Sequence, residues 1–398
     1  MARARTIIIA GAGIGGLTAA LALARKGFRV VVLEAVRRLE EAGAGIQLSP
    51  NATRALFSLG LGDYLLPHVV TSEAIRIRVG RSGRKITRLT LGQEAEVRHG
   101  APYWLIHRGD LQRALLEAAA EHPDIVLKLG VSVADHASHP QGVTVAASAS
   151  GNVARIMVEE HGIALIGADG LWSPVRKSLG HTETPRFRRR TAWRAIVPAD
   201  QVEPGWRAPM TNLWLGANTH LVHYPVQAGR AINLVAILQD KTELCGWDEP
   251  GSRDELNARF VRWAPAAKAL LASAQSWQRW SLYDMPPLPY WGRERATLLG
   301  DAAHAALPFL AQGGAMAIED AMVLADELGR MPDDPARALR AYERRRMPRT
   351  ASVMREAARA GRIYHLWGPL AVGRNLVMSA RGEKLRARYD WLYDWRAE

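Results

Sequence analysis

The sequence predicts a mixed α/β fold: a Rossmann-like domain on a parallel sheet, interleaved with a domain on an antiparallel sheet, and a helical C-terminus. Three observations lead to this prediction. Residues 6–34 read as a strand–helix–strand unit, residues 187–240 alternate with period two, and the chain from Gln312 onward has helical patterns. With 398 residues and 48% hydrophobic content, the chain can bury one large core or two.

The opening unit has the spacing of a dinucleotide-binding motif. Residues 6–10 (TIIIA) are an apolar run too short for a helix, and residues 11–16 (GAGIGG) then supply G-x-G-x-x-G as a helix opens at Leu17. Residues 30–33 read as the second strand. Because a strand precedes the glycines and a helix follows them, the pattern favours dinucleotide binding over a glycine-rich turn without a ligand.

Each glycine of this motif has its own role, and an acidic residue closes the unit. Gly11 permits the tight turn, Gly13 lets the backbone approach a pyrophosphate, and Gly16 lets the helix lie close to the strand. The phosphates are expected at the helix N-terminus, where free N–H groups and the helix dipole favour negative charge. Glu34, at the end of the second strand, is placed to accept hydrogen bonds from a ribose diol.

The later elements follow from periodicity and from the positions of glycine and proline. A hairpin with one solvated face is expected over residues 75–91, and an antiparallel sheet over residues 187–240. Residues 296–300 form a buried-strand run with Asp301 at its carboxyl end, where open parallel sheets place their ligands. Helices are expected at residues 52–59, 111–121 and 254–276, strands at 125–129, 143–149, 156–160 and 165–168, and breaks in the C-terminal helices at Pro332, Pro348 and Pro369.

The net charge limits the classes of partner that the protein is expected to bind. A formal net charge of +13 is compatible with nucleic acid, an acidic membrane surface or small anions. The two arginine runs, residues 188–190 and 344–346, lack the interleaved aromatic residues of a single-strand binding surface, and we interpret them as solvated faces. No stretch is long and apolar enough to span a bilayer. We therefore expect small anionic ligands, with neither nucleic acid nor membrane as a partner.

The single cysteine, Cys245, cannot form an internal disulfide, and nothing near it has the spacing of metal ligands. The sequence therefore predicts no metal site and fits a reducing cytoplasm as the location of the protein. We interpret Cys245 as a small buried apolar residue.

Three separated motifs, in this order, carry a resemblance to a known family: GAGIGG at residues 11–16, GADG at 167–170, and LLGDAAHAALPFLAQGGAMAIEDA at 298–321. Together they resemble the single-component FAD-dependent aromatic hydroxylases, the class A flavoprotein monooxygenases. The resemblance covers nearly the whole chain. GAGIQLSPNA at residues 43–52, HRGDL at 107–111 and HLVHYPV at 220–226 resemble most closely the branch acting on salicylate, 3-hydroxybenzoate and 6-hydroxynicotinate.

The resemblance implies how the domains are divided. The FAD-binding domain is expected to be discontinuous and to comprise residues 1–70, 101–180 and 285–355. The substrate-binding domain would comprise residues 71–100 and 181–284, and residues 356–398 would form C-terminal helices.

The resemblance also assigns cofactor-binding residues. The first glycine motif would hold the ADP pyrophosphate, Glu34 the adenosine ribose, Arg108 the phosphate and ribityl side, and Asp301 the ribityl chain; the Asp-Gly motif would contact both FAD and NAD(P)H. The complete expected set is Gly11, Gly13, Gly15, Gly16, Glu34, Arg108, Asp169, Gly170, Asp301, Gln312, Gly313 and Gly314. A strand-end turn for Asp169 and a helix cap for Asp301 are the structural alternatives.

The chemistry of the segment after the Gly-Asp motif agrees with this assignment. Gln312, Gly313 and Gly314 open a helix whose backbone N–H groups can face the part of a flavin where negative charge builds on reduction. His304 is expected to shape the turn before this helix. Ala305 stands where the family often has proline.

The resemblance implies that NADH or NADPH reduces the flavin and that O2 then forms a C4a-hydroperoxide, which hydroxylates an electron-rich ring. A histidine suits removal of the phenol proton at neutral pH. In HLVHYPV, His220 and Tyr224 share one face of a strand while His223 points to the other, and His220 with Tyr224 matches the family's histidine–tyrosine pair. We expect His220 to be the base; a hydrogen-bonded structural histidine is the alternative.

The expected substrate is a small, phenolic, anionic aromatic acid. Gln47, Tyr103, Pro308 and Phe309 are the candidate pocket residues, and Trp193 and Trp214 could line the pocket, although buried packing is the expected role of most tryptophans here. The protein is expected to be a monomer or homodimer. Two rival functions stay open: an FAD-dependent oxidase or dehydrogenase that inserts no oxygen, and a basic nucleic-acid- or membrane-binding protein on a nucleotide-fold scaffold.

Overall fold

The computed structural model describes residues 5–39, 43–150, 155–244 and 249–397. The prediction about Cys245 lies outside these residues. Among the described residues, none of the helices combines the length and the apolar character that crossing a bilayer requires.

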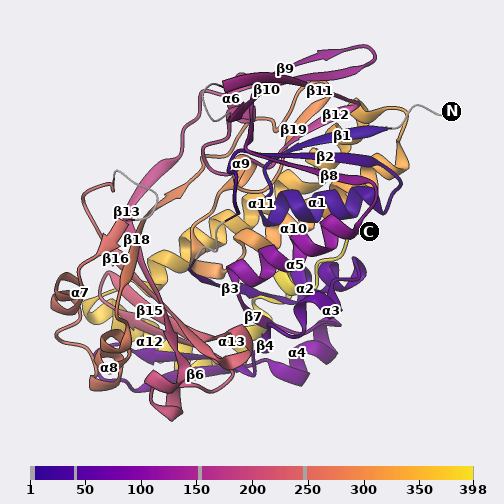
Figure 1. Cartoon of the computed structure of the whole chain (residues 1–398). Coiled ribbons are helices and arrows are strands. Elements are labelled where there is room, and N and C mark those ends of the chain that lie inside the picture. Colours follow the sequence, from indigo (N-terminus) through magenta and orange to yellow (C-terminus); the bar gives the residue numbers. More distant parts are fainter. Residues whose placement is uncertain (1–4, 40–42, 151–154, 245–248, 398) are drawn as a thin grey trace.

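The opening unit forms the centre of a five-stranded parallel sheet, as predicted (Figure 1). The strand order is β19 (Ala296–Leu298), β12 (Ala164–Gly167), β1 (Thr6–Ala10), β2 (Arg29–Glu34) and β8 (Ile125–Leu129). The buried runs of β1 and β12 are apolar throughout, because both faces of this sheet are covered.

Different structures cover the two faces of the parallel sheet (Figure 1). Helices α1 (Ile14–Ala24), α5 (Arg108–Glu121) and α10 (Gly313–Arg330) lie on one face. On the other lies a three-stranded antiparallel sheet of β9 (Val131–His139), β10 (Gly142–Ser150) and β11 (Arg155–Gly162). The short helices α6 (Pro174–Ser178) and α9 (Asp301–His304) are the next elements after β12 and β19.

The predicted antiparallel sheet has eight strands. Their order is β17 (Glu249–Gly251), β18 (Trp277–Asp284), β13 (Arg186–Pro198), β16 (Ala231–Gln239), β15 (Thr219–Val226), β14 (Met210–Gly216), β5 (Ala74–Val79) and β6 (Lys85–Thr90). The pairing is antiparallel except between β14 and β5, where the predicted hairpin joins the sheet in parallel. One face packs with the helices α7 (Arg253–Arg259) and α8 (Pro265–Ser273) on a separate apolar core, in which Trp193 and Trp214 are fully buried. These two tryptophans therefore pack in the core, and they do not line the pocket.

A small sheet and several short helices connect these parts. The sheet has the order β3 (Gly45–Leu48), β7 (Trp104–His107) and β4 (Val70–Thr71). The helices beside it are α2 (Pro50–Ser58), α3 (Gly62–Leu65) and α4 (Gly92–His99), and 3₁₀ turns occur at Ala199–Gln201, Pro204–Trp206, Gln227–Gly229 and Pro308–Leu310.

The predicted helix over residues 254–276 is wrong in its extent. The chain forms two helices, α7 (Arg253–Arg259) and α8 (Pro265–Ser273), and then the strand β18. Pro265 stands in the first turn of α8, where its missing N–H costs nothing, but inside a continuous helix it would remove a hydrogen bond. Because the sequence has a helical pattern on both sides of residues 260–264, the pattern did not reveal the boundary between α7 and α8.

The predicted break at Pro348 is also wrong, because α11 (Pro335–Tyr364) runs through this proline for 30 residues. A proline inside a helix costs about 3 kcal/mol. The helix buries residues on both sides of Pro348, including Arg346, Thr350 and Val353, and this packing outweighs the local cost. Boundaries near Pro332 and Pro369 are confirmed, since α10 ends at Arg330 and α12 (Gly368–Arg381) has a proline in its first turn.

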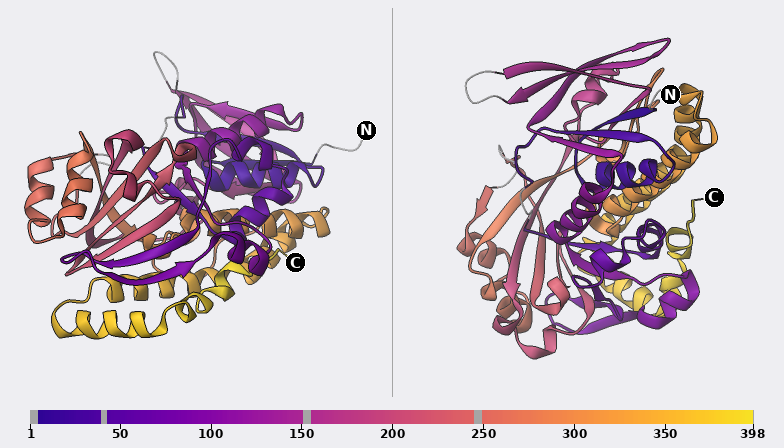
Figure 2. Two further views of the ribbon diagram at one scale, coloured as in Figure 1. Left: turned by 90° about the horizontal axis from the view of Figure 1, so that it is seen from below. Right: turned by 45° about the vertical axis from the view of Figure 1, so that its right-hand side comes forward.

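The C-terminal helices (yellow) run along one side of the molecule next to the eight-stranded sheet (Figure 2). After α12 come α13 (Lys384–Ala387) and α14 (Asp390–Tyr393), and both α12 and α13 contact β6. Arg349 of α11 donates hydrogen bonds to the carbonyl oxygens of Trp391 (3.2 Å) and Leu392 (3.0 Å). These bonds fasten the end of the chain to α11, next to the edge of the eight-stranded sheet that α12 and α13 contact, and there it closes a cavity described below.

Candidate active site

The glycine turn after β1 is shaped by close backbone contacts. Gly11 has φ +102°, and a Cβ there would lie 2.4 Å from the carbonyl oxygen of Ala168. A Cβ at Gly16 would lie 2.0 Å from the carbonyl oxygen of Gly11. At Gly13, the N-cap of α1, a Cβ would meet no protein atom within 4 Å. The protein's own packing therefore requires Gly11 and Gly16, whereas the space beside Gly13 is open to a ligand.

This contrast gives a prediction with an internal control. Gly13→Ala is expected to leave the fold intact and to weaken FAD binding, because its methyl group enters ligand space without touching protein. Gly16→Ala is expected to destabilise the protein by about 1–3 kcal/mol or more, because its methyl group overlaps a backbone oxygen. Denaturant unfolding of the flavin-free proteins and FAD titration measure the two effects. Equal stability losses in both variants would contradict this division of roles.

The open space beside Gly13 is part of a cavity of about 340 Å³ between the parallel sheet and the eight-stranded sheet. It brings together many of the predicted residues from distant parts of the sequence. Those that line it are Gly13, Gly15, Gln47, Arg108, Gly170, His220, Tyr224, Asp301, Pro308, Gly313 and Gly314. The N-termini of α1 and α10 both face this cavity, so free backbone N–H groups approach it from two directions.

The residues present fit FAD. Helix N-termini and Arg108 suit a pyrophosphate, and Gly313 at the start of α10 leaves room for a flat ring. A Cβ at Gly313 would meet no protein atom within 4 Å, while one at Gly314 would lie 2.7 Å from Ile46 Cδ1. An N-terminal helix dipole at this position stabilises a ring that gains negative charge.

Five predicted cofactor residues do not line the cavity and support it from behind. Gly11 and Gly16 form the turn itself. Glu34 accepts hydrogen bonds from the backbone N–H groups of Ala12 (2.7 Å) and Val36 (3.0 Å). A carboxylate has about four acceptor positions, so these bonds leave capacity for a ribose.

The other two, Asp169 and Gln312, hold local structure. Asp169 accepts hydrogen bonds from Ser173 Oγ and from the Val175 N–H (3.0 Å), and burial raises its pKa. Gln312 Nε2 donates to Ser49 Oγ at 2.9 Å. Both side chains thus fix the turns whose backbone borders the cavity, at Gly170 and at Gly313.

A smaller cavity of about 110 Å³ adjoins the first, and the two share Gln47, His220, Val222, Pro308 and Ala311. Gln47 is the centre of its hydrogen bonds, because its Oε1 accepts from Tyr103 Oη (2.9 Å) and from Thr211 Oγ1 (3.3 Å). Burial raises the pKa of Tyr103 and of Tyr224, so both phenols stay protonated as donors. The C-terminal residues Tyr389, Leu392 and Tyr393 close this cavity. Within the described part of the chain, its lining residues include no lysine or arginine.

His220 lies where the two cavities meet. Its Nδ1 is 2.7 Å from Nε2 of His365, and its ring packs edge-on against Phe309. Since Nδ1 is engaged, Nε2 is the nitrogen that remains for a ligand. Burial, together with the nearby His365 and Arg190, lowers the pKa of His220 well below 6.5. At neutral pH the ring is therefore uncharged and able to accept a proton.

The predicted strand parity is confirmed. Tyr224 lines the same cavity as His220, whereas His223 lies on the opposite face, beside Trp206 and Trp214. Burial lowers the pKa of His223 to about 3. His223 is therefore a neutral core residue on the far side of the sheet from the cavity.

A buried ionic network behind the cavity was not predicted from the sequence. Asp320 of α10 accepts hydrogen bonds from the Gly300 N–H (3.0 Å), His304 Nε2 (2.5 Å) and Arg346 Nε (2.7 Å). Arg346 also pairs with Glu319 at 2.8 Å. Burial raises the pKa of Asp320, but the charges of His304 and Arg346 outweigh it and set the pKa to about 2.

This network corrects one interpretation and confirms another. Arg346 was interpreted as part of a solvated arginine run, yet its side chain is only 1% exposed. The amino-acid pattern could not show this, because the partners lie on a different helix. His304 does shape the turn at Gly300, as expected, since both residues bond to Asp320. His365 was also missed, and no feature of the sequence distinguishes it.

Comparisons of this chain with known proteins agree with the geometry of the site. The FAD binding domain family matches residues 4–357. The chain is 36% identical over 399 residues to 3-hydroxybenzoate 6-hydroxylase of Klebsiella oxytoca, covering 100% of this chain and 98% of that protein. It is 39% identical over 373 residues to 3-hydroxybenzoate 6-hydroxylase 1 of Aquipseudomonas alcaligenes, covering 94% and 93%.

A solved structure extends this agreement to three dimensions. Klebsiella pneumoniae HpxO, in complex with FAD and uric acid, superposes with a TM-score of 0.85 at 28% identity and covers 98% of this chain and 96% of its own. The predicted fold class, the family resemblance and the FAD cofactor are thereby confirmed. The chain belongs to the FAD binding domain family and is an FAD-dependent aromatic hydroxylase of the class A flavoprotein monooxygenases.

Proposed function

We propose that the protein hydroxylates a small phenolic aromatic acid of the hydroxybenzoate type, with NADH or NADPH as reductant. The balanced reaction is ArH + O2 + NAD(P)H + H⁺ → ArOH + NAD(P)⁺ + H2O. The observation that carries the proposal is the position of His220, a neutral imidazole at the junction of the cofactor cavity and the smaller cavity. The names of the relatives support a hydroxybenzoate as substrate.

His220 is the proposed base for the substrate phenol. If its Nδ1–H donates to His365, the free Nε2 can accept the phenol proton, which makes the ring richer in electrons. Tyr224 and Gln47 would orient the ring through hydrogen bonds, and Pro308 and Phe309 would border it. Because none of the described residues that line the small cavity is a lysine or arginine, we expect hydroxyl and amide donors to bind the carboxylate of the substrate.

FAD, when bound, supplies the activation of O2 for this chemistry. Gly13, Arg108, Asp301 and Gly313 would hold it in the larger cavity. The protein must also exclude water from the reacting ring. The aromatic side chains packed around His220, among them Phe309 and Tyr364, would do this.

The test is consumption of NADH and of NADPH by the FAD-loaded protein with salicylate, 3-hydroxybenzoate, 4-hydroxybenzoate and 6-hydroxynicotinate. Mass analysis of the products is part of the same experiment. Addition of one oxygen atom to one of these rings is the expected result. Peroxide as the sole product with all four acids would favour an oxidase or a different class of aromatic substrate.

When the pH is lowered, kcat/KM is expected to start to fall only below pH 6.5. This parameter reports titration of the free enzyme, in which burial lowers the pKa of His220. As pH falls through 6.5 the ring therefore stays neutral, and activity is lost only when pH falls through the lowered pKa. Initial rates at low substrate concentration, measured across the acid range in which FAD stays bound, check this expectation. An acid limb at or above 6.5 would contradict the assignment of a buried histidine base.

A further inference from the structure

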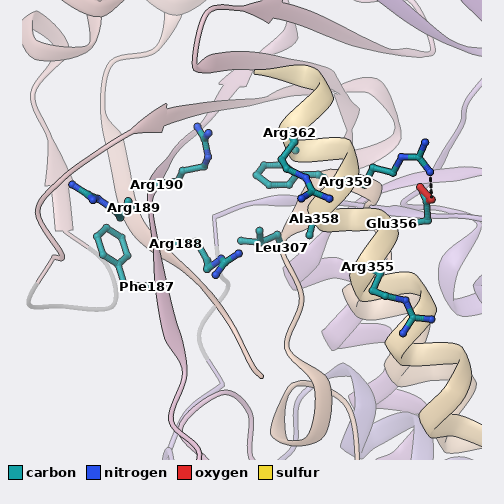
Figure 3. Close-up of a pocket in the computed structure, with 12 residues that line it drawn as sticks. Phe187, Arg188, Arg189, Arg190, Leu307, Arg355, Glu356, Ala358, Arg359 and Arg362 are labelled. Atoms are coloured by element: carbon teal, nitrogen blue, oxygen red, sulfur yellow. Dashed lines mark hydrogen bonds and ion pairs between the residues drawn. The ribbon is translucent and has the colours of Figure 1, made fainter. Parts of the chain in front are cut away.

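A groove of about 690 Å³ lies between strand β13 and helix α11, and arginines dominate its walls (Figure 3). They are Arg188, Arg189 and Arg190 on the strand and Arg355, Arg359 and Arg362 on the helix. Among the lining residues that the structure describes, the one carboxylate is Glu356, which is already paired with Arg359 (3.3 Å) and Arg388 (2.9 Å). The groove therefore presents a strong excess of positive charge.

A distortion of β13 places the strand arginines in this groove. Phe187 pairs with Tyr283 and Thr191 pairs with Ser281, so three residues of β13 oppose one residue of β18. Within this bulge Arg189 has φ +52°, a left-handed conformation that is unfavourable for a residue with a Cβ. Bulges and strained residues of this kind recur next to functional sites, where they redirect side chains.

The arginines are not all engaged by the protein. Arg188 pairs with Asp284 at 3.2 Å, and Arg190 donates a hydrogen bond to the carbonyl oxygen of Asn218 at 3.1 Å. The side chains of Arg189 and Arg362 are exposed and have no hydrogen-bond or ion-pair partner within the described ranges. Arg362 lies on the helix wall of the groove and Arg189 on the strand wall, where its side chain extends away from the helix, and both are available to an anion (Figure 3).

The groove shares a wall with the active site. Leu307 and Phe309 line it, and the residue between them, Pro308, lines both inner cavities. The ring of Phe309 packs on His220 and sits so close to Gly361 of α11 that a Cβ there would lie 2.4 Å from the ring. A ligand bound along the arginines therefore reaches the turn that borders the flavin cavity.

We propose that this groove binds the pyrophosphate of the nicotinamide dinucleotide that reduces FAD, with Arg189 and Arg362 as phosphate ligands. This inference rests on the proposed use of NAD(P)H. Guanidinium groups bind phosphate oxygens in bidentate pairs, and several arginines match a ligand with several phosphate charges. The single carboxylate of an aromatic acid would leave most of these cations unmatched, and the acid's proposed cavity is far smaller, at about 110 Å³.

Arg189→Gly and Arg362→Gln test the proposal. Glycine at 189 relieves the left-handed strain while it removes the guanidinium, so loss of binding cannot be attributed to unfolding. The dissociation constant of NADH and of NADPH is measured from anaerobic flavin reduction, and binding of ADP-ribose is measured directly by calorimetry. Each variant is expected to weaken dinucleotide binding by about tenfold or more, since a hydrogen bond to a charged group is lost.

Arg344→Gln is the matched control, because Arg344 is an exposed arginine of the same helix that does not line the groove. It removes the same charge and is expected to leave dinucleotide binding unchanged. Wild-type dinucleotide binding by both groove variants, or a rise confined to the KM of the aromatic acid, would overturn the assignment of the groove. A wild-type protein that oxidises neither NADH nor NADPH would overturn the proposed function as well, so the two failures are distinguishable.

Discussion

Replacement of His220 by glutamine is expected to lower kcat for hydroxylation by a factor of about 10²–10⁴ while FAD stays bound. Glutamine keeps a hydrogen-bonding side chain of similar length next to His365, but it cannot take up the phenol proton. Reduction of the flavin by NAD(P)H does not need this proton transfer. We therefore expect reductant consumption to continue and to yield peroxide in place of hydroxylated product.

His223→Gln is the control, because His223 lies three residues along the same strand on its opposite face. This variant is expected to lose some stability and to keep the ratio of product to reductant consumed. Product analysis by mass and peroxide assay give this ratio for both proteins. Wild-type hydroxylation by the His220 variant would remove His220 from the role of base.

The parts of this site that could be predicted from sequence are those set by local backbone geometry. The spacing of Gly11, Gly13 and Gly16 predicts the turn, the alternation in β15 predicts that His220 and Tyr224 share a face, and Gly313 marks a helix start. Each follows from residues within one turn or one strand. Resemblance to a family then joined these separate stretches into one site.

The parts that could not be predicted depend on contacts between distant segments. His365 is 145 residues from His220, and Arg346 is 26 residues from Asp320, on another helix. An arginine run looks the same in sequence whether its members are solvated or buried. Burial of Arg346 follows from how α11 lies on α10, and exposure of Arg189 follows from a bulge that depends on the register of β18.

Arg346→Met is expected to destabilise the protein by about 3–5 kcal/mol, because it leaves buried carboxylates without their cation. Glu319 would keep Arg349 (2.6 Å) as a partner, whereas Asp320 would keep only His304 among its charged partners. The loss of ion pairing therefore affects mainly Asp320, because its low pKa depends on the charges of both His304 and Arg346. Denaturant unfolding with and without FAD measures the change.

Arg344→Met removes the same charge from an exposed position two residues earlier, and it is expected to change stability by less than about 0.5 kcal/mol. The functional consequence follows from what Asp320 holds. It fixes Gly300 next to Asp301, and it belongs to α10, whose N-terminus faces the cofactor cavity. Weaker FAD binding should therefore accompany the lost stability in the Arg346 variant. If FAD affinity stayed at the wild-type value, the network would stabilise the fold without positioning the cofactor site.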